Sequence, residues 1–219
     1  MCKNHKTNVI KISEVIDILF RDYTATKVVY HVVTITDLEK TLKNGIRFHD
    51  KATYKSKYHE FHSFFDERKP DRLPDWVMRS KSVFASLNFK NDHIWHSHSA
   101  VLSIKIKEDL CWVCNENIAN FLYEPLMLGH VEGFDSAKEF IIKKGSRVAE
   151  DYWNCSLSFI ENLKQRKDKK AGYDAEVLIM HDILPKDIEL LFIASDHRCM
   201  EANKWKDFFQ SNQLNYTNC

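Results

Sequence analysis

Two residues in strand-like segments stand out as candidates for chemistry, His31 and Glu176. His31 lies in residues 27–34 (KVVYHVVT), whose β-branched and aromatic side chains predict a strand. Glu176 begins the apolar segment 175–180 (AEVLIM), a second predicted strand. A carboxylate at a strand entrance can face a cleft and stabilise a developing positive charge there. Each residue also has an ordinary structural explanation, as a hydrogen-bonded core histidine or a solvated strand end.

The segment that follows His31 contains the clearest local signals in the chain. Thr36 and Glu39 have the spacing of a capping box, in which each side chain satisfies a free backbone N–H at a helix start. Gly45 comes where the end of that helix needs a positive φ. Residues 27–48 are therefore expected to form a strand, a helix and a short strand.

The remaining segments predict one α+β domain over residues 1–219, without internal repeats or a Gly/Ser-rich linker. The alternation in residues 100–107 is typical of a half-buried strand. Residues 50–80 are expected to form a short helix and then an irregular segment. Further strands are expected over 82–89, 111–114 and 188–195, and helices over 8–22, within 115–160 and over 197–210.

Four segments together resemble the ADP-ribosyltransferase fold, and in particular the DarT group of toxins and uncharacterised bacterial relatives of that group. The segments are YHVVTITDLEKTLKNGI, RSKSVFASL, AEDYW and YDAEVLIMHDILPKDIELLFI, which lie between residues 29 and 195. The first and last are the most specific. The resemblance implies a split mixed or antiparallel β core with flanking helices, and NAD as a co-substrate.

The resemblance also implies roles for individual residues. His31, with Tyr30 and Thr34 on the same strand, matches the family histidine that hydrogen-bonds the nicotinamide side of NAD. Glu176 matches the glutamate that orients the nicotinamide ribose and stabilises the oxocarbenium-like charge as the glycosidic bond breaks. Arg79 precedes the second core strand, where a guanidinium can grip the pyrophosphate; the alternative is a surface arginine.

Four further residues are weaker candidates for binding NAD or the acceptor. Ser82, or else Ser86, is expected to contact ribose or nicotinamide unless it faces solvent. Tyr152 is expected to stack on nicotinamide, and core packing is the alternative. Asp174 lies two positions before the glutamate, where enzymes that modify arginine often carry an acidic or amide residue, but this sequence has no Gln-x-Glu or Glu-x-Glu there.

A basic run precedes the predicted glutamate strand, and the resemblance places the substrate-recognition loop there. As a mobile, solvated loop it would attract phosphates, which favours DNA or RNA as the acceptor. Aromatic residues between 54 and 65 either stack unpaired bases or belong to the core. A protein acceptor remains the alternative. The basic residues expected to bind substrate are Lys164, Arg166, Lys167, Lys169 and Lys170.

No metal site is predicted. Cys111 and Cys114 form a C-x-x-C, but the second close pair that a zinc site needs is missing. His93, His96 and His98 are dense enough for metal ligation, yet an exposed loop explains them as well.

Composition leaves the partner class open but favours the cytoplasm as the compartment. Net charge is +1, no apolar stretch approaches the roughly 20 residues of a membrane helix, and no signal peptide is visible. A cytoplasmic protein without a membrane partner is therefore expected. The resemblance implies that it is a toxin or defence effector, with an antitoxin or an ADP-ribose-removing protein as its antagonist. The alternatives are an RNA 2′-phosphotransferase-like enzyme, which Glu176 argues against, a non-catalytic binding module, and a metal-dependent nucleic-acid binder.

Overall fold

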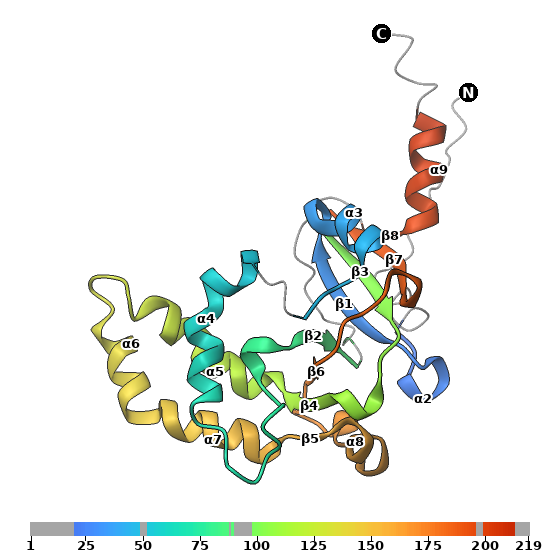
Figure 1. The fold of residues 1–219 in the computed structure, drawn as a ribbon. Coiled ribbons are helices and arrows are strands. Elements are labelled where there is room, and N and C mark those ends of the chain that lie inside the picture. The colour runs from blue at the N-terminus through green and yellow to red at the C-terminus, as the bar shows by residue number, and fades with distance from the viewer. Residues whose placement is uncertain (1–19, 49–51, 88, 90–97, 196–198, 213–219) are drawn as a thin grey trace.

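The computed structural model describes residues 20–48, 52–87, 89, 98–195 and 199–212, and they fold into one large sheet with helices around it (Figure 1). The strands are β1 Val29–Thr34, β2 Val83–Ser86, β3 Ser99–Ile104, β4 Cys111–Asn115, β5 Leu157–Ser158, β6 Ala175–Ile179, β7 Ile188–Ala194 and β8 Cys199–Glu201. The α-helices are α2 Tyr23–Thr26, α3 Ile35–Asn44, α4 Ala52–Asp66, α5 Glu116–Leu128, α6 Asp135–Phe140, α7 Ser146–Cys155, α8 Phe159–Gln165 and α9 Ala202–Asn212. Shorter helical turns are η1 Arg79–Lys81, η2 Glu108–Leu110, the π-helical η3 Ile141–Gly145, η4 Lys167–Lys169 and η5 Pro185–Asp187.

The sheet is antiparallel throughout and is nearly divided in the middle. Its strand order is β5-β4-β6-β2-β1-β3-β7-β8. β1 and β3 share six register pairs and β2 and β6 share four, whereas β1 and β2 share only Tyr30↔Ser86. Two half-sheets, β5-β4-β6-β2 and β1-β3-β7-β8, therefore meet at one point.

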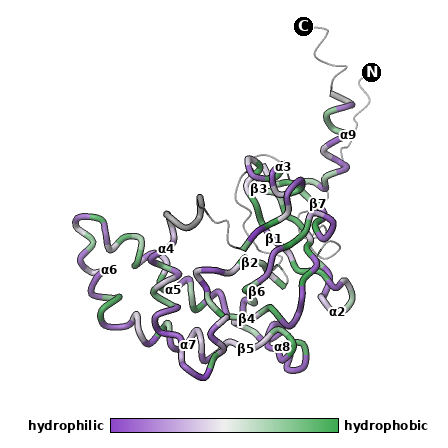
Figure 2. The backbone as a smooth tube through the Cα atoms, in the orientation of Figure 1, coloured by the Kyte–Doolittle hydropathy of each residue, from purple (hydrophilic) through white to green (hydrophobic). Residues whose placement is uncertain are grey.

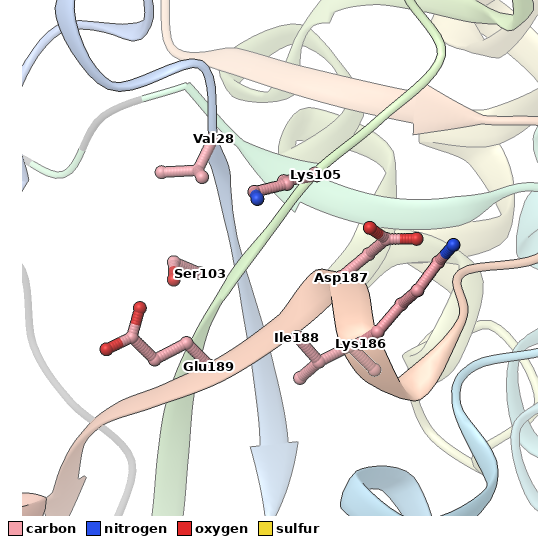
Figure 3. A pocket seen from close by; sticks show the side chains of 7 residues that line it. All are labelled: Val28, Ser103, Lys105, Lys186, Asp187, Ile188 and Glu189. Carbon is pink, nitrogen blue, oxygen red and sulfur yellow. The ribbon is translucent and has the colours of Figure 1, made fainter.

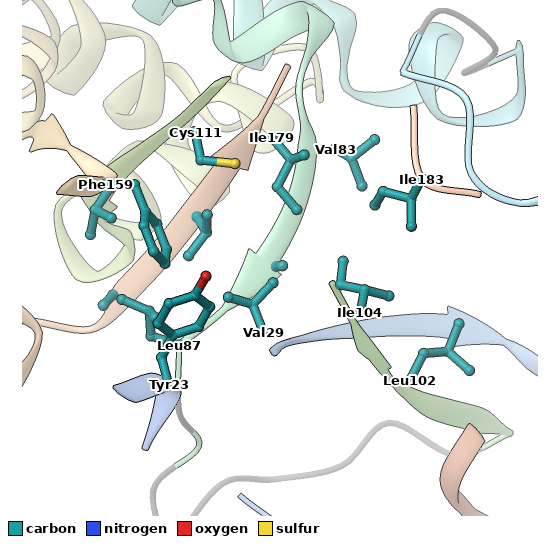
Figure 4. Close-up of a cluster of buried hydrophobic side chains, with 14 of the residues drawn as sticks. Tyr23, Val29, Val83, Leu87, Leu102, Ile104, Cys111, Phe159, Ile179 and Ile183 are labelled. Atoms are coloured by element: carbon teal, nitrogen blue, oxygen red, sulfur yellow. The ribbon is translucent and has the colours of Figure 1, made fainter. Parts of the chain in front are cut away.

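The main core fills the space between these half-sheets. Val29, Leu102 and Ile104 from one half pack with residues of β2, β4 and β6 from the other, and Tyr23 and Phe159 close the cluster (Figure 4). Figure 2 shows hydrophobic and hydrophilic colours alternating along the strands; β4 and β6 are buried at every position, whereas β1 and β7 are buried at only some. Each buried aliphatic side chain contributes roughly 1.5–3 kcal/mol relative to exposure.

The strand expected over 100–107 is present as β3, but it ends at Ile104 and is buried at every position from Ser99 onward rather than half-buried. Leu102 and Ile104 face the main core, while Val101 faces a second cluster with Phe20 and Phe192. Of the polar positions in the alternating pattern, Ser103 is therefore covered as well, whereas Lys105 and Lys107 lie beyond the strand and are exposed. Ser103 is 6% exposed.

A helical layer of α4, α5, α6 and α7 lies to one side of the sheet (Figure 1). It covers the other face of β4 and β6 with a cluster that includes Phe65, Tyr152 and Leu178. The indole N–H of Trp153 donates to the carbonyl of Phe65 at 2.6 Å, which joins α7 to α4. This layer positions the residues that surround Glu176.

The predicted strand and helix after residue 27 are confirmed, but the predicted capping box is wrong. The helix α3 begins at Ile35, so Thr34 is the N-cap residue and Thr36 already lies in the first turn. The Thr34 hydroxyl donates to the Asp37 carboxylate at 3.0 Å. Gly45 ends the helix at φ 78°, and a Cβ there would lie 2.2 Å from the carbonyl oxygen of Ile183, so glycine is required.

Other boundaries differ from the sequence predictions. The short strand expected after Gly45 is a single bridge between Ile46 and Ile183. The strand expected over 82–89 is limited to Val83–Ser86, and the helix expected over 197–210 begins only at Ala202, after the edge strand β8. The helix expected over 8–22 falls largely outside the described residues. None of the helices within the described ranges is long and apolar enough to cross a membrane.

Candidate active site

Glu176 lies near the start of β6 and points toward the helical layer. Its register partners are Cys114 of β4 and Ser86 of β2, and Ser86 pairs in turn with Tyr30 of β1. Directly opposed residues share one face of a sheet. A row of Cys114, Glu176, Ser86 and Tyr30 therefore crosses the junction of the two half-sheets, and only 4% of Glu176 is exposed.

Two side chains hold the Glu176 carboxylate. The Arg79 guanidinium forms an ion pair with its Oε1, and the Tyr152 hydroxyl donates to the same oxygen at 2.8 Å. Arg79 Nη1 also donates to the Tyr152 hydroxyl. Both bonds to the carboxylate end on Oε1, and among the described residues Oε2 accepts none.

Local structure fixes Arg79 in place. Arg79 lies in η1, the turn that leads into β2, and its backbone N–H donates to the Asp66 carboxylate at 2.7 Å. The N–H of Ser80 donates to the other oxygen of Asp66 at 2.9 Å. The end of α4 thus caps this turn and directs the arginine into the protein.

Four aromatic rings surround the guanidinium. Its carbon lies 4.8–5.3 Å from the ring centroids of Phe61, Phe65, Phe84 and Tyr152. Such contacts stabilise a cation that has lost its water. Arg79 Nε is buried and has no hydrogen-bond partner among the described residues.

Burial and charge set the ionisation of this cluster. Burial opposes the charged form of Arg79, but the Glu176 carboxylate outweighs it and raises the pKa of the guanidinium above its usual value. Burial raises the pKa of Tyr152 well above 10, and burial together with Glu176 raises the pKa of the Cys114 thiol. The Tyr152 hydroxyl therefore keeps its proton at neutral pH and can donate a hydrogen bond, and Cys114 remains a thiol.

His31 does not join this cluster directly. As the neighbour of Tyr30 on a strand, it points to the opposite face. Its Nδ1 lies 2.6 Å from the carbonyl oxygen of Phe84, so Nδ1 carries the proton and donates. The Phe84 ring contacts Arg79, so one residue of β2 links His31 to the site around Glu176.

Three predicted NAD contacts lie elsewhere. Tyr30 is buried; its hydroxyl donates to the carbonyl of Arg21, and its ring meets Phe20 edge-on. Thr34 is exposed at the start of α3. Ser82 is fully buried and donates to the carbonyl of Arg79, so it neither faces solvent nor reaches the carboxylate.

Arg79 and Tyr152 both lie at Glu176, where they contact its carboxylate; the prediction had them contact the pyrophosphate and nicotinamide of NAD. The alternative of a surface arginine is wrong, since Arg79 is 4% exposed. Tyr152 is fully buried and packs edge-on against Phe65, so its ring belongs to the core. Asp174 supports the start of β6, with its N–H donating to Asn115 Oδ1 and its carbonyl accepting from Glu116.

The basic run is largely helical, which corrects the prediction of a loop, while Lys164, Lys169 and Lys170 are exposed to solvent. Residues up to Gln165 end α8, and Lys167–Lys169 form η4. Asp168 is buried and accepts from Asn162 at 3.0 Å. Arg166 and Lys169 both form ion pairs with Asp22, at 2.6–2.7 Å, and these pairs partly neutralise the positive charge of the run.

The other basic residues of the run also have local contacts. Lys164 pairs with Glu161 at 2.7 Å, and Lys167 donates to the carbonyl of Cys155 at 3.3 Å. Lys170 is exposed on the segment that leads to β6. Their role in binding substrate stays a prediction.

The described residues contain no cluster of histidine, cysteine and acidic side chains that could hold a metal ion. Cys111 packs in the main core and Cys114 in the helical-layer cluster, so the C-x-x-C places its thiols on opposite faces of β4. His98 is exposed at φ 58°. His93 and His96 lie outside the described residues.

Sequence reasoning missed the rings that enclose the site. Phe61 and Phe65 are buried, which assigns these aromatics to the core rather than to exposed stacking positions. His62 stacks on Phe84 with ring centroids 5.0 Å apart. The i, i+4 spacing of Phe61 and Phe65 in HEFHSFF is the signal that indicates a helix face packed against the sheet.

Comparisons with models of protein families, with curated proteins and with solved structures find no match to this chain.

Proposed function

We propose that this protein is an NAD-dependent ADP-ribosyltransferase that releases nicotinamide and transfers ADP-ribose to a nucleic acid, as a toxin or defence effector. The observation that carries the proposal is the Glu176 carboxylate, held by Arg79 and Tyr152 beside the junction of the half-sheets. The resemblance in sequence implies a split core with a glutamate on this strand, and the observed sheet divides between β1 and β2.

The chemistry needs a carboxylate whose orientation is set before the reaction. Breaking the bond between nicotinamide and ribose develops positive charge at the ribose C1 and its ring oxygen. A fixed carboxylate in a site that excludes water stabilises that charge by a few kcal/mol. Arg79 and Tyr152 meet Oε1, which leaves Oε2 to accept a hydrogen bond from a ribose hydroxyl.

Access to Glu176 requires a side chain to move. Glu176 is 4% exposed and Arg79 lies against it. A pyrophosphate offers Arg79 an alternative anionic partner, and its unpartnered Nε is a donor suited to a phosphate oxygen. NAD thus fits the donor set if Arg79 turns from Glu176 to the pyrophosphate, which exposes the carboxylate to the ribose.

The nucleic-acid acceptor is the less constrained part of the proposal. Its support is a short segment with the exposed lysines Lys164, Lys169 and Lys170, which ends six residues before Glu176. Arg166 forms ion pairs with Asp22 and Asp168, so it contributes less to nucleic-acid binding than its place in the basic run suggests. Protein remains the alternative acceptor.

A labelling experiment tests the proposal. NAD labelled in its adenosine moiety is incubated with the purified protein and, separately, with single-stranded DNA, RNA or total cell protein. We expect label on DNA or RNA, and none with Glu176→Gln. Glu150→Gln, which makes the same change at an exposed position of α7, is the matched control and should retain activity.

The other outcomes have definite meanings. Label confined to protein would replace the nucleic acid with the alternative acceptor. Release of nicotinamide without labelled polymer would indicate hydrolysis of NAD. A folded protein that neither binds nor cleaves NAD would contradict the proposal and leave a non-catalytic binding module.

A further inference from the structure

A pocket separate from the Glu176 site opens at the far end of β6. It has a volume of about 550 Å³, within the roughly 300–1,000 Å³ of small-molecule sites. Its walls come from the segment after β3, the end of β6, η5 and the segment after α3. Phe48, Lys105, Ile106, Lys107, Met180, His181, Asp182, Leu184 and Asp187 line it.

Backbone hydrogen bonds fix the walls of this pocket. The N–H of Lys105 donates to the carbonyl of Asp187 at 2.9 Å, and the N–H of Phe48 donates to Asp182 at 3.1 Å. His181 accepts from the N–H of Lys107 at 2.9 Å, and its other ring nitrogen contacts the carbonyl of Asp182. Both ring nitrogens of His181 therefore contact backbone groups of the pocket walls, which hold the pocket in shape without a ligand.

The charged side chains of the pocket are not paired with one another. Lys105 and Lys107 are exposed, and within the described ranges neither forms an ion pair. Two amino groups at positions i and i+2 offer a mobile pair of donors to a phosphate. Asp182 and Asp187 add acceptors, so a fitting ligand carries both an anionic group and N–H donors.

The apolar lining completes the recognition set. Phe48 offers an aromatic ring, and Ile106 and Met180 form an apolar wall. Leu184 is 51% exposed at the rim, an apolar surface that a flat ligand would cover. A nucleobase is flat, stacks on aromatic rings and carries N–H donors on its edge.

We infer that this pocket binds a nucleotide unit, with its phosphate at Lys105 and Lys107 and an amino-bearing base between Phe48 and the carboxylates. Guanine, adenine and cytosine have an exocyclic amino group, whereas uracil and thymine lack it. The same chemistry occurs in a free nucleotide and in one residue of a nucleic-acid strand. This inference does not depend on transferase activity.

The pocket is distinct from its neighbours. Met180 lies four positions after Glu176, roughly 13 Å along an extended strand. The smaller hollow beside it, which shares Lys105 and Asp187, encloses about 110 Å³ and suits water or an ion (Figure 3). Of these two pockets of the described residues, the larger is therefore the one with room for a nucleotide.

Calorimetric titration of the full chain tests the inference. GMP, AMP, CMP, UMP and inorganic phosphate are titrated in turn at low salt. We expect the three amino-bearing nucleotides to bind at least about threefold tighter than UMP, and all of them tighter than phosphate. Lys107→Ala should weaken GMP binding about tenfold, and Lys43→Ala, an exposed lysine on α3, should leave it unchanged.

Two further measurements complete the test. Affinity for a ten-nucleotide RNA or DNA that is also lowered by Lys107→Ala identifies a strand as the source; affinity for mononucleotides alone identifies a free nucleotide. Glu176→Gln should bind GMP like the wild type, whether or not the transferase proposal holds. Phosphate binding as tight as GMP, GMP binding that Lys107→Ala leaves unchanged, or no binding at all would overturn the inference.

Discussion

Glu176 is held in a nearly closed site because Arg79 and Tyr152 both meet one oxygen of its carboxylate. Removing one partner of a buried ion pair costs about 3–5 kcal/mol, since the remaining charge has lost both water and its partner. The two side chains are each 5% exposed, so this penalty applies here. Substitutions at this site therefore alter stability as well as activity, and experiments must separate the two.

The first prediction concerns the stability of the pair. Glu176→Leu or Arg79→Met alone should lower the free energy of unfolding by about 3–5 kcal/mol. The double variant Arg79→Met with Glu176→Leu should recover most of that loss, because it leaves no unpaired charge. Urea unfolding of the four proteins gives the coupling energy; additive losses would show that the two charges do not stabilise each other.

The second prediction concerns Tyr152. Tyr152→Phe keeps the ring in the core but removes the hydroxyl that orients Glu176. We expect a loss in kcat for NAD cleavage of roughly tenfold, the effect of about one hydrogen bond, with KM little changed. Thermal stability should fall as well, because Arg79 and Glu176 each lose a buried hydrogen-bond partner. Steady-state kinetics measures both constants, and an unchanged kcat would remove Tyr152 from the positioning of the carboxylate.

At the scale of elements, the segment before β6 is tied to the start of the chain. Asp22 caps α2 by accepting from Thr24 and pairs with Arg166 and Lys169. Partial burial opposes the carboxylate charge, but bonds from Arg166 and Lys169 outweigh it and lower the pKa of Asp22 well below its usual range. The approach to Glu176 is thus held by the N-terminal part of the domain.

The third prediction follows from the sign of that shift. A carboxyl whose pKa is lower in the folded state stabilises the fold above its unfolded pKa of about 4 and loses this contribution as pH falls below it. Asp22→Asn should therefore destabilise the protein at pH 7 and weaken the decline in stability below about pH 4. Denaturant melts at pH 7 and in acid measure it; parallel curves for both proteins would contradict the pairing.

Much of the strand pattern was predictable from particular residues. The β-branched run around His31 and the apolar run after Glu176 are both strands, because strong local preference and the core agree there. The cap at Thr34 was missed because Thr34, Thr36 and Asp37 all offer short polar side chains. The enclosure of Glu176 was not predictable, since it joins residues 73 and 97 positions apart in sequence.

At the scale of the whole molecule, two cores share the sheet. Cys111 lies in the core between the half-sheets and Cys114 in the core beneath the helical layer, although three positions separate them. Burial raises the pKa of both thiols, so neither forms reactive thiolate in the folded state. The two cysteines report on the two cores independently.

The fourth prediction uses these thiols to test the single domain. Pulsed alkylation at pH 8 across a urea series should modify Cys111 and Cys114 at one midpoint, because β4 and β6 contribute to both cores. Peptide mass spectrometry distinguishes the two sites. Labelling of Cys114 at clearly lower urea than Cys111 would show that the helical layer unfolds on its own and that the chain contains two cooperative units.

The central claim is that Glu176 assists cleavage of NAD, and nicotinamide release tests it most directly. Release is measured with wild type, Glu176→Gln and the exposed control Glu150→Gln, each shown to be folded by circular dichroism and thermal melting. We predict that Glu176→Gln lowers kcat by at least about a hundredfold, while Glu150→Gln matches the wild type. A folded Glu176→Gln protein that releases nicotinamide at the wild-type rate would contradict the claim.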